Sequence, residues 1–163
     1  MPRKARELLA QIGALPWRDD LRRRVQHYGY RYDYKARRVT RDSYLGPLPE
    51  WLATLVGGLS ADGIFEAVPD QVIVNEYLPG QGIAAHVDCE PCFGDMIASL
   101  SLGSGCTMES RRSVRSRRWR TGSNRRVCSC SKAHPALTGS MGLRRGARTR
   151  WAARACHGAG GFR

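Results

Sequence analysis

Long apolar runs are absent from this sequence of 163 residues, and none approaches the about 20 residues that a membrane-spanning helix needs. The first residues show no signal-peptide pattern, and no internal repeat is visible at a spacing of roughly 20 to 50 residues. The length suits one domain of ordinary size. We therefore expect a cytoplasmic monomer with no membrane partner.

Acidic residues and large apolar residues are scarce in the last third of the chain. Residues 109–163 contain 15 basic residues and one acidic residue, a net charge of +14, whereas residues 1–108 contain 12 basic and 13 acidic residues, a net charge of −1. No Tyr follows Tyr77, and no Ile follows Ile97. Burial of so few apolar side chains does not offset the conformational entropy that a chain loses when it becomes ordered. We therefore divide the chain at residue 108 and predict that 109–163 is a disordered or out-of-frame tail; an Arg-rich arm for nucleic acid is the alternative.

Residues 1–108 have the periodicity of a folded protein. The patterns predict helices over 3–12 and 50–59, and strands over 25–34, 71–77, 83–88 and 96–102. Pro/Gly turns separate these elements. If the turn at 78–82 makes a hairpin, the side chains of Asn75 and Tyr77 would share one face with the strand 83–88. Short strands after one or two helices favour a mainly β, or α+β, fold with the helices outside a sheet or barrel.

Tyrosines recur at every second position of the first expected strand, at Tyr28, Tyr30, Tyr32 and Tyr34. Period two predicts that all four rings lie on one face of the strand. Such a face could stack a flipped nucleic-acid base, or it could be ordinary packing on a sheet. Basic residues on both sides of this strand could contact phosphate or be a solvated surface; they are Arg22, Arg23 and Arg24 before it and Arg37, Arg38 and Arg41 after it.

The pair His86 and Asp88 is the strongest chemical signal. On a strand, residues two apart point the same way, so an imidazole and a carboxylate would converge. They would supply two of the three ligands of a 2-His-1-carboxylate iron site. By itself the pair is also explained by a surface strand or by a histidine in the core.

A longer pattern surrounds this pair. It comprises Asn75, Tyr77, Pro79, Gly80, Ile83, His86, Asp88, Phe93, Gly94 and the run SLSLGS at 99–104. Over about residues 15–108 the sequence resembles the AlkB-like Fe(II)- and 2-oxoglutarate-dependent dioxygenases. The resemblance implies a double-stranded β-helix (jelly-roll) core with flanking N-terminal helices, whose C-terminal part would be incomplete in this chain.

The resemblance also implies roles for particular residues. His86 and Asp88 would bind Fe(II), and Asn75 and Tyr77 would hydrogen-bond the co-substrate 2-oxoglutarate. The family also needs a distal His and an Arg after Met108; His134 and His157 lack the strand context expected of that ligand.

We therefore predict an oxidoreductase that demethylates or hydroxylates a nucleic-acid base (DNA or RNA) and is impaired in this chain. A non-catalytic basic nucleic-acid-binding protein and an inactive fragment are the alternatives.

Six Cys residues without an export signal favour reduced thiols. Cys89 and Cys92 form a C-x-x-C that could bind zinc or act in redox chemistry. Because no second pair follows at a suitable spacing, a loop that simply leaves the iron strand is the simpler interpretation.

Overall fold

The computed structural model describes residues 3–19, 21–86, 89 and 92–104, and beyond them the backbone of the strands that lie between residues 106 and 158. In these residues the elements follow one another in the order α1 (Arg3–Gly13), β1 (Val25–Tyr28), a 3-10 turn (Arg41–Ser43), α2 (Glu50–Ala61), β2 (Gln71–Tyr77), β3 (Gly82–His86), β4 (Phe93–Gly103), β5 (Cys106–Arg112), β6 (Ser116–Ser123), β7 (Ser129–Lys132), β8 (Leu137–Gly142) and β9 (Arg150–Gly158).

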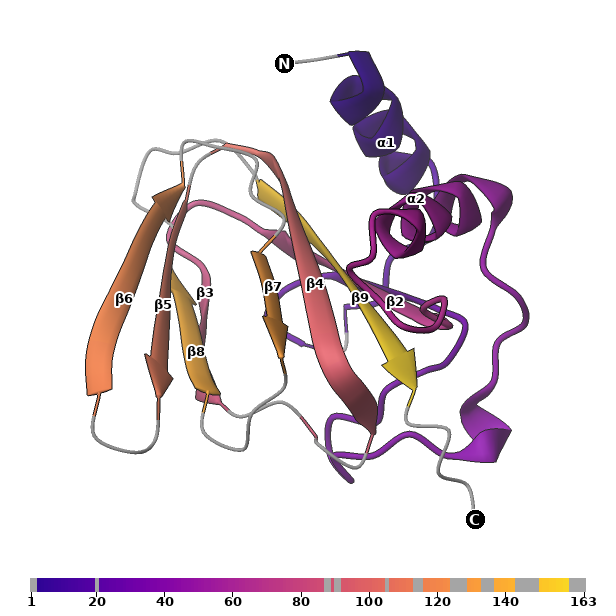
Figure 1. Cartoon of the computed structure of the whole chain (residues 1–163). Coiled ribbons are helices and arrows are strands. Elements are labelled where there is room, and N and C mark those ends of the chain that lie inside the picture. Colours follow the sequence, from indigo (N-terminus) through magenta and orange to yellow (C-terminus); the bar gives the residue numbers. More distant parts are fainter. Residues whose placement is uncertain are drawn as a thin grey trace.

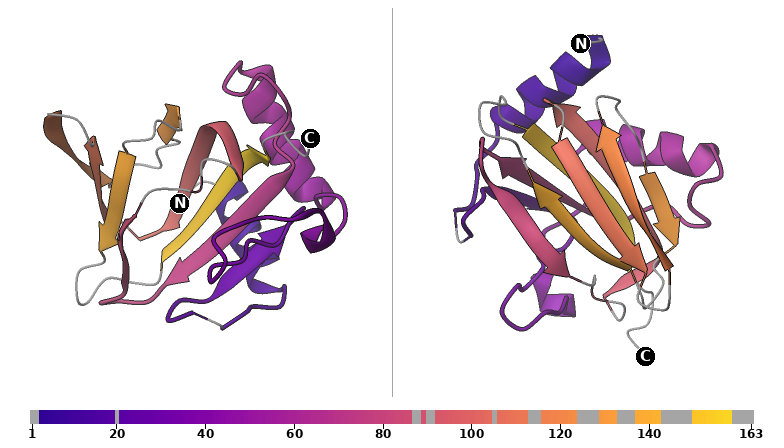
Figure 2. Two further views of the ribbon diagram at one scale, coloured as in Figure 1. Left: turned by 90° about the horizontal axis from the view of Figure 1, so that it is seen from below. Right: turned by 90° about the vertical axis from the view of Figure 1, so that its left-hand side faces the viewer.

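The strands form two antiparallel sheets. One sheet has the order β1-β2-β9-β4-β7, and the other has the order β3-β8-β5-β6. Both helices lie on one side of the five-stranded sheet, and the four-stranded sheet lies on the other side (Figures 1 and 2). The expectation of a mainly β fold with outer helices is confirmed at this level.

Both expected helices are present within one or two residues of their predicted ends. α1 buries Ala5 and Ile12, which are seven positions and therefore two turns apart. α2 begins after Pro49, whose fixed φ suits the start of a helix, and it ends just before Gly63, where φ is +72°. Within the described residues, neither helix has the length and apolar character required to cross a membrane.

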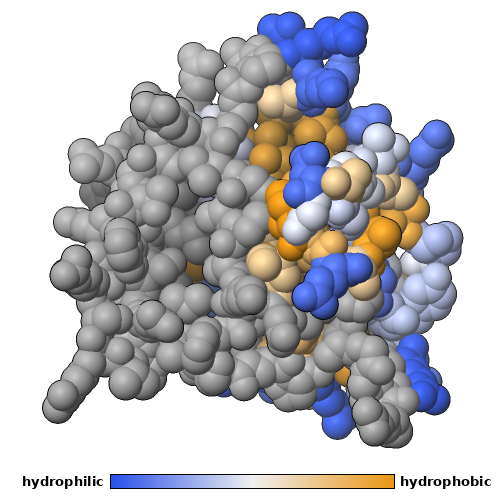
Figure 3. All heavy atoms as spheres, viewed as in Figure 1, coloured by the Kyte–Doolittle hydropathy of each residue, from blue (hydrophilic) through white to orange (hydrophobic). Residues whose placement is uncertain are grey.

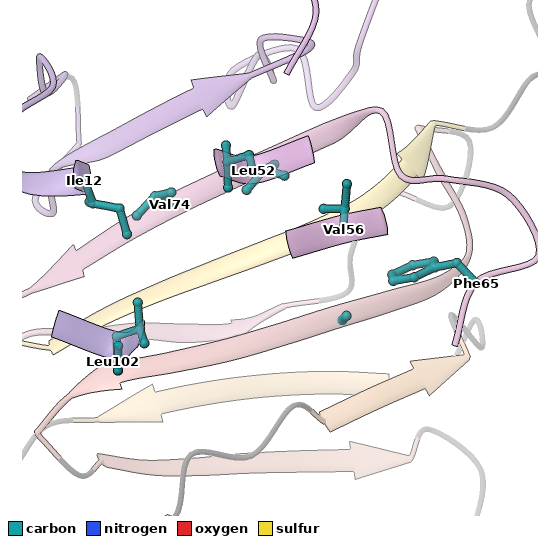
Figure 4. Close-up of a cluster of buried hydrophobic side chains, with 9 residues drawn as sticks. Ile12, Leu52, Val56, Phe65, Val74 and Leu102 are labelled. Carbon is teal, nitrogen blue, oxygen red and sulfur yellow. The ribbon is translucent and has the colours of Figure 1, made fainter. Parts of the chain in front are cut away.

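The main core lies between the helices and the five-stranded sheet. Ile12 from α1, together with Leu52 and Val56 from α2, packs against Val74 of β2 and Leu102 of β4 (Figure 4). On the face of the molecule where the two helices lie, hydrophobic residues gather and hydrophilic residues surround them (Figure 3). Burial of such side chains contributes about 1.5–3 kcal/mol each and fixes the helices against the sheet.

A buried amide joins the end of α1 to β1. The side-chain nitrogen Nε2 of Gln26 donates to the backbone oxygens of Ile12 (2.9 Å) and Leu15 (3.1 Å). The hydroxyl of Tyr28 in turn donates to Oε1 of Gln26 at 2.9 Å. The last carbonyls of a helix lack partners within the helix, so Gln26 supplies donors that the end of α1 requires.

The tyrosine strand is shorter than predicted, because β1 ends at Tyr28. Gly29 follows with a φ of +77°, a conformation that turns the backbone out of the strand. Tyr28 packs edge-on against Trp51 of α2 at 5.7 Å between ring centroids. Tyr30 contacts Tyr44 instead, and Tyr32 contacts Phe93. The prediction that the four rings share one face is therefore wrong.

The turn after β2 does not make a hairpin. β2 pairs with β1 and β9, whereas β3 pairs with β8 in the other sheet. The turn at 78–81 therefore carries the chain from one sheet to the other. The expectation that the β2 and β3 side chains share one face of a hairpin is wrong for this reason.

The predicted division at residue 108 stays a prediction. The backbone of strands β5 to β9 is described beyond it, and β9 lies between β2 and β4.

Candidate functional site

Two of the predicted site residues, Asn75 and Tyr77, lie on the inner face of β2, which is the face turned away from the helices. Val72 and Val74 belong to the core under the helices, whereas Ile73 belongs to a second cluster with Phe93 and Ile97. The alternation of side chains places Asn75 and Tyr77 on the same face as Ile73. Asn75 is 5% exposed and Tyr77 is 3% exposed, so both polar groups are buried.

Arg23 occupies the space beside these two residues. Its Nε donates to Oδ1 of Asn75 at 2.8 Å. Its guanidinium carbon lies 5.9 Å from the ring centroid of Tyr77 and 5.6 Å from that of Tyr34. These distances allow a cation–π attraction to both rings. A positive charge, an amide and a tyrosine therefore meet at one point of the sheet.

Aromatic side chains extend the same cluster. Tyr34 lies 5.0 Å from Tyr32 and 5.7 Å from His27, measured between ring centroids, and Tyr32 lies 5.6 Å from Phe93. Burial raises the pKa of Tyr34 above its usual value, although the charge of Arg23 and a hydrogen bond from it oppose the rise. The hydroxyl of Tyr34 therefore stays protonated at neutral pH.

Tyr28 is separate from this cluster. It lies on the helix side of the sheet, where burial raises its pKa to about 12. Of the four predicted tyrosines, Tyr32 and Tyr34 are the two that reach the inner side, and Tyr30 pairs with Tyr44.

His86 is the last residue of β3, which lies in the four-stranded sheet. The register of β3 against β8 shifts between Ile83 and His86. Such an irregularity re-aims the side chains at a strand end. Nδ1 of His86 lies 2.8 Å from the backbone oxygen of Ala84. If Nδ1 donates its proton to this oxygen, the lone pair of the ring lies on Nε2. This tautomer of the imidazole is a form that binds a metal.

The second predicted ligand, Asp88, lies outside the described residues, and so does His134. The backbone of His157 lies on β9, so the expectation that His157 lacks a strand context is wrong. In the described part of the chain, no three His, Cys, Asp or Glu side chains gather in a group that could hold a metal ion. The ligand pair of His86 and Asp88 therefore stays a prediction.

The C-x-x-C after this strand is a disulfide between Cys89 and Cys92, with a Cα–Cα distance of 5.3 Å. Both sulfur atoms lie against the backbone oxygen of Arg37. The expectation of reduced thiols is wrong for this pair. The bond closes a short turn between β3 and β4, and the contacts of its sulfur atoms with Arg37 join this turn to the loop that follows the tyrosines.

Sequence reasoning did not single out Arg23 from its two neighbours. Its partner Asn75 is 52 positions away, so no local spacing connects the two. The three consecutive arginines have different surroundings: Arg22 is exposed, Arg23 reaches the inner face, and Arg24 pairs with Glu76.

The ion pair between Arg24 and Glu76 allows a test of this arrangement. Nε and Nη2 of Arg24 lie 2.5 Å and 2.9 Å from the two carboxylate oxygens of Glu76, whose side chain is only 5% exposed. Glu76 raises the pKa of Arg24 further through this hydrogen bond. Because Arg24→Ala would leave the buried carboxylate of Glu76 without this partner, we expect it to lower the free energy of unfolding by about 1–2 kcal/mol; the half exposure of Arg24 keeps the loss this small. Urea unfolding measures the change, and Arg22→Ala is the matched control; equal stability of the two variants would show that the ion pair contributes nothing.

Residues 6–148 match the family described as the 2OG-Fe(II) oxygenase superfamily. The chain therefore belongs to this family of oxygenases, which use Fe(II) and 2-oxoglutarate. Its relatives are AlkB-like proteins, so the resemblance seen in the sequence is confirmed.

Three relatives illustrate the likeness. The tRNA (carboxymethyluridine(34)-5-O)-methyltransferase ALKBH8 of Mus musculus is 43% identical over 88 residues, which are 53% of this chain and 13% of the mouse protein. The alkylated DNA repair protein ALKBH8 homolog of Arabidopsis thaliana is 39% identical over 111 residues, 65% of this chain and 32% of that protein. The solved structure of OsALKBH1 has a TM-score of 0.59 at 13% identity and covers 94% of this chain and 92% of that chain, which shows a shared fold. The chain thus spans less than a third of the length of these two curated relatives.

Proposed function

We propose that this chain is an AlkB-like dioxygenase that uses Fe(II), O2 and 2-oxoglutarate to demethylate or hydroxylate a nucleic-acid base, on a double-stranded β-helix core. The family match over residues 6–148 carries the proposal. The names of two relatives support the substrate class, since one is a tRNA (carboxymethyluridine(34)-5-O)-methyltransferase and the other is an alkylated DNA repair protein.

The residues of β2 fit an anionic co-substrate. 2-Oxoglutarate carries two carboxylates, and the inner face of β2 presents a buried amide and a buried phenol beside a guanidinium. Asn75 would donate from Nδ2, and Tyr77 would donate from its hydroxyl. A carboxylate in a buried place is stable only where such donors and an opposite charge meet it.

His86 and Asp88 would hold the iron, with Nε2 of His86 as the donor atom. Bound there, Fe(II) would allow O2 to act as the oxidant: one oxygen atom would enter a C–H bond of the substrate to give C–OH, and the other would enter the succinate formed from 2-oxoglutarate with loss of CO2. The protein's own part is to bind the co-substrate through β2, to keep the imidazole in one tautomer through the oxygen of Ala84, and to exclude water from the inner face.

Turnover of 2-oxoglutarate tests the proposal. The chain is incubated with Fe(II), ascorbate, 2-oxoglutarate and a methylated RNA or DNA oligonucleotide, and succinate and formaldehyde are measured. We expect metal-dependent succinate below the level of an intact relative, because the sequence after Met108 does not continue the family pattern with its distal His and Arg. Nucleic-acid binding without any succinate would favour the non-catalytic alternative.

The loop that follows β1 offers a place for the nucleic acid. Tyr44 is 55% exposed and lies 5.0 Å from Tyr30 between ring centroids. Five exposed basic residues lie in the surrounding stretch 29–46, at Arg31, Lys35, Arg37, Arg38 and Arg41. Stacking of a base on an exposed ring next to basic side chains is a common way to hold single-stranded nucleic acid.

We expect Tyr44→Ala to weaken binding of a fluorescein-labelled single-stranded RNA about ten-fold, because stacking of one base on an aromatic ring is lost. Fluorescence anisotropy at one fixed salt concentration gives the dissociation constants. Leu45→Ala is the matched control, since Leu45 is the next residue, is 54% exposed and has no aromatic face. If both variants bind like the unsubstituted chain, the nucleic acid does not use this loop.

A further inference from the structure

Arg23 contacts the inner face of the five-stranded sheet. Its side chain bonds to Asn75 and lies over the rings of Tyr34 and Tyr77. It therefore links β2 to the aromatic loop from a position just before β1, and two of its three partners are the predicted co-substrate ligands.

The bond to Asn75 has a directional consequence. A guanidinium has donors and no acceptor, so it bonds only to the oxygen of an amide. With Oδ1 turned toward Nε of Arg23 at 2.8 Å, the amide nitrogen Nδ2 of Asn75 is turned to the opposite side. Without the guanidinium, the two ends of the amide are similar in size and would be free to exchange places. Arg23 thus selects which end of Asn75 is presented to a bound molecule.

The contacts with the rings add rigidity. The guanidinium is planar and stacks well on aromatic faces, which an ammonium does less specifically. Tyr77 is 3% exposed and Tyr34 is mostly buried, so the stacked group has little room to move. The position of the Tyr77 ring, and through it the position of its hydroxyl, is restrained by Arg23.

We propose that Arg23 is a positioning residue for the carboxylate-bearing co-substrate: it holds Asn75 with Nδ2 as the outward donor and restrains Tyr77 beside it. This proposal rests on the proposed function, because it takes 2-oxoglutarate as the molecule that Asn75 and Tyr77 bind. Arg23 acts through these residues, and its charge also favours an anion near them.

Binding of N-oxalylglycine, a non-reacting analogue of 2-oxoglutarate, tests the proposal on the full chain loaded with Mn²⁺. Isothermal titration calorimetry gives the affinities. We expect Arg23→Gln to weaken binding about ten-fold. Arg23→Lys should weaken it by a similar factor, because a lysine keeps the charge and loses the planar fork. Arg22→Gln, at the exposed neighbouring position, should change nothing.

A double-mutant cycle separates positioning from direct contact. If Arg23 acts through Asn75, then Arg23→Gln should have little further effect in an Asn75→Ala background. Fully additive losses would overturn the proposal, and so would restoration of normal affinity by Arg23→Lys. Thermal unfolding of each variant shows whether the protein is still folded.

A readout without any ligand keeps the two proposals apart. The side-chain amide protons of Asn75 are visible in a ¹⁵N-correlated NMR spectrum, and we expect Arg23→Gln to shift both of them and to speed their exchange with water. Unchanged signals would show that Arg23 does not orient Asn75. If the unsubstituted chain fails to bind N-oxalylglycine while these signals respond to Arg23→Gln, the proposed function is wrong and the orientation of Asn75 by Arg23 stands.

Discussion

His86→Ala should weaken metal binding at least about 100-fold, because it removes a ligand that the protein backbone holds in place. The chain places Nδ1 of His86 at 2.8 Å from the oxygen of Ala84, at the end of a strand whose register is irregular. This contact would leave Nε2 to bind the metal without a proton to displace. Mn²⁺ binding followed by electron paramagnetic resonance measures the loss, and any Fe(II)-dependent succinate formation should fall with it.

Substitutions of Asp88, His134 and His157 provide the comparison for this prediction. Asp88→Ala should resemble His86→Ala, since the carboxylate is the second predicted ligand. His134→Ala should bind Mn²⁺ like the unsubstituted chain. A loss in His134→Ala or His157→Ala equal to that of His86→Ala would show that the tail supplies a third ligand, which the sequence interpretation does not expect. Normal binding by His86→Ala would end the assignment of the iron site.

Gly29→Ala should destabilise the fold by about 3–5 kcal/mol, a large part of the total stability of a typical domain. Two causes combine. A φ of +77° costs a residue with a side chain roughly 1–2 kcal/mol. An added Cβ would also lie 1.8 Å from the backbone oxygen of Asp70, so the start of β2 would have to move. Thermal unfolding followed by circular dichroism should show a lower Tm.

Gly63→Ala is the matched control for Gly29→Ala. Gly63 has a similar φ of +72°, and a Cβ there would meet nothing within 4 Å. We therefore expect Gly63→Ala to cost only the conformational part, roughly 1–2 kcal/mol. Equal losses in the two variants would mean that the contact with Asp70 does not matter.

The tyrosine region illustrates how a correct local rule can mislead. Alternate positions of a strand do share a face, but β1 ends at Tyr28, so the other three tyrosines lie beyond the strand. Gly29 turns the chain because its lack of a side chain permits both a positive φ and the close approach of Asp70. The sequence shows the glycine, but it does not show that another segment lies against it.

The sequence alone determined the elements whose signal is local: the amphipathic spacing of α1 and α2, the apolar run of β2, and the motif that contains Asn75, Tyr77 and His86. These depend on residues a few positions apart, so period and propensity suffice. The tertiary structure alone decided that β2 and β3 belong to different sheets and that Arg23 rather than Arg22 or Arg24 reaches Asn75. The reason is physical: strand partners and contacts across 52 residues depend on which distant surfaces are buried together, and short-range patterns carry no record of that choice.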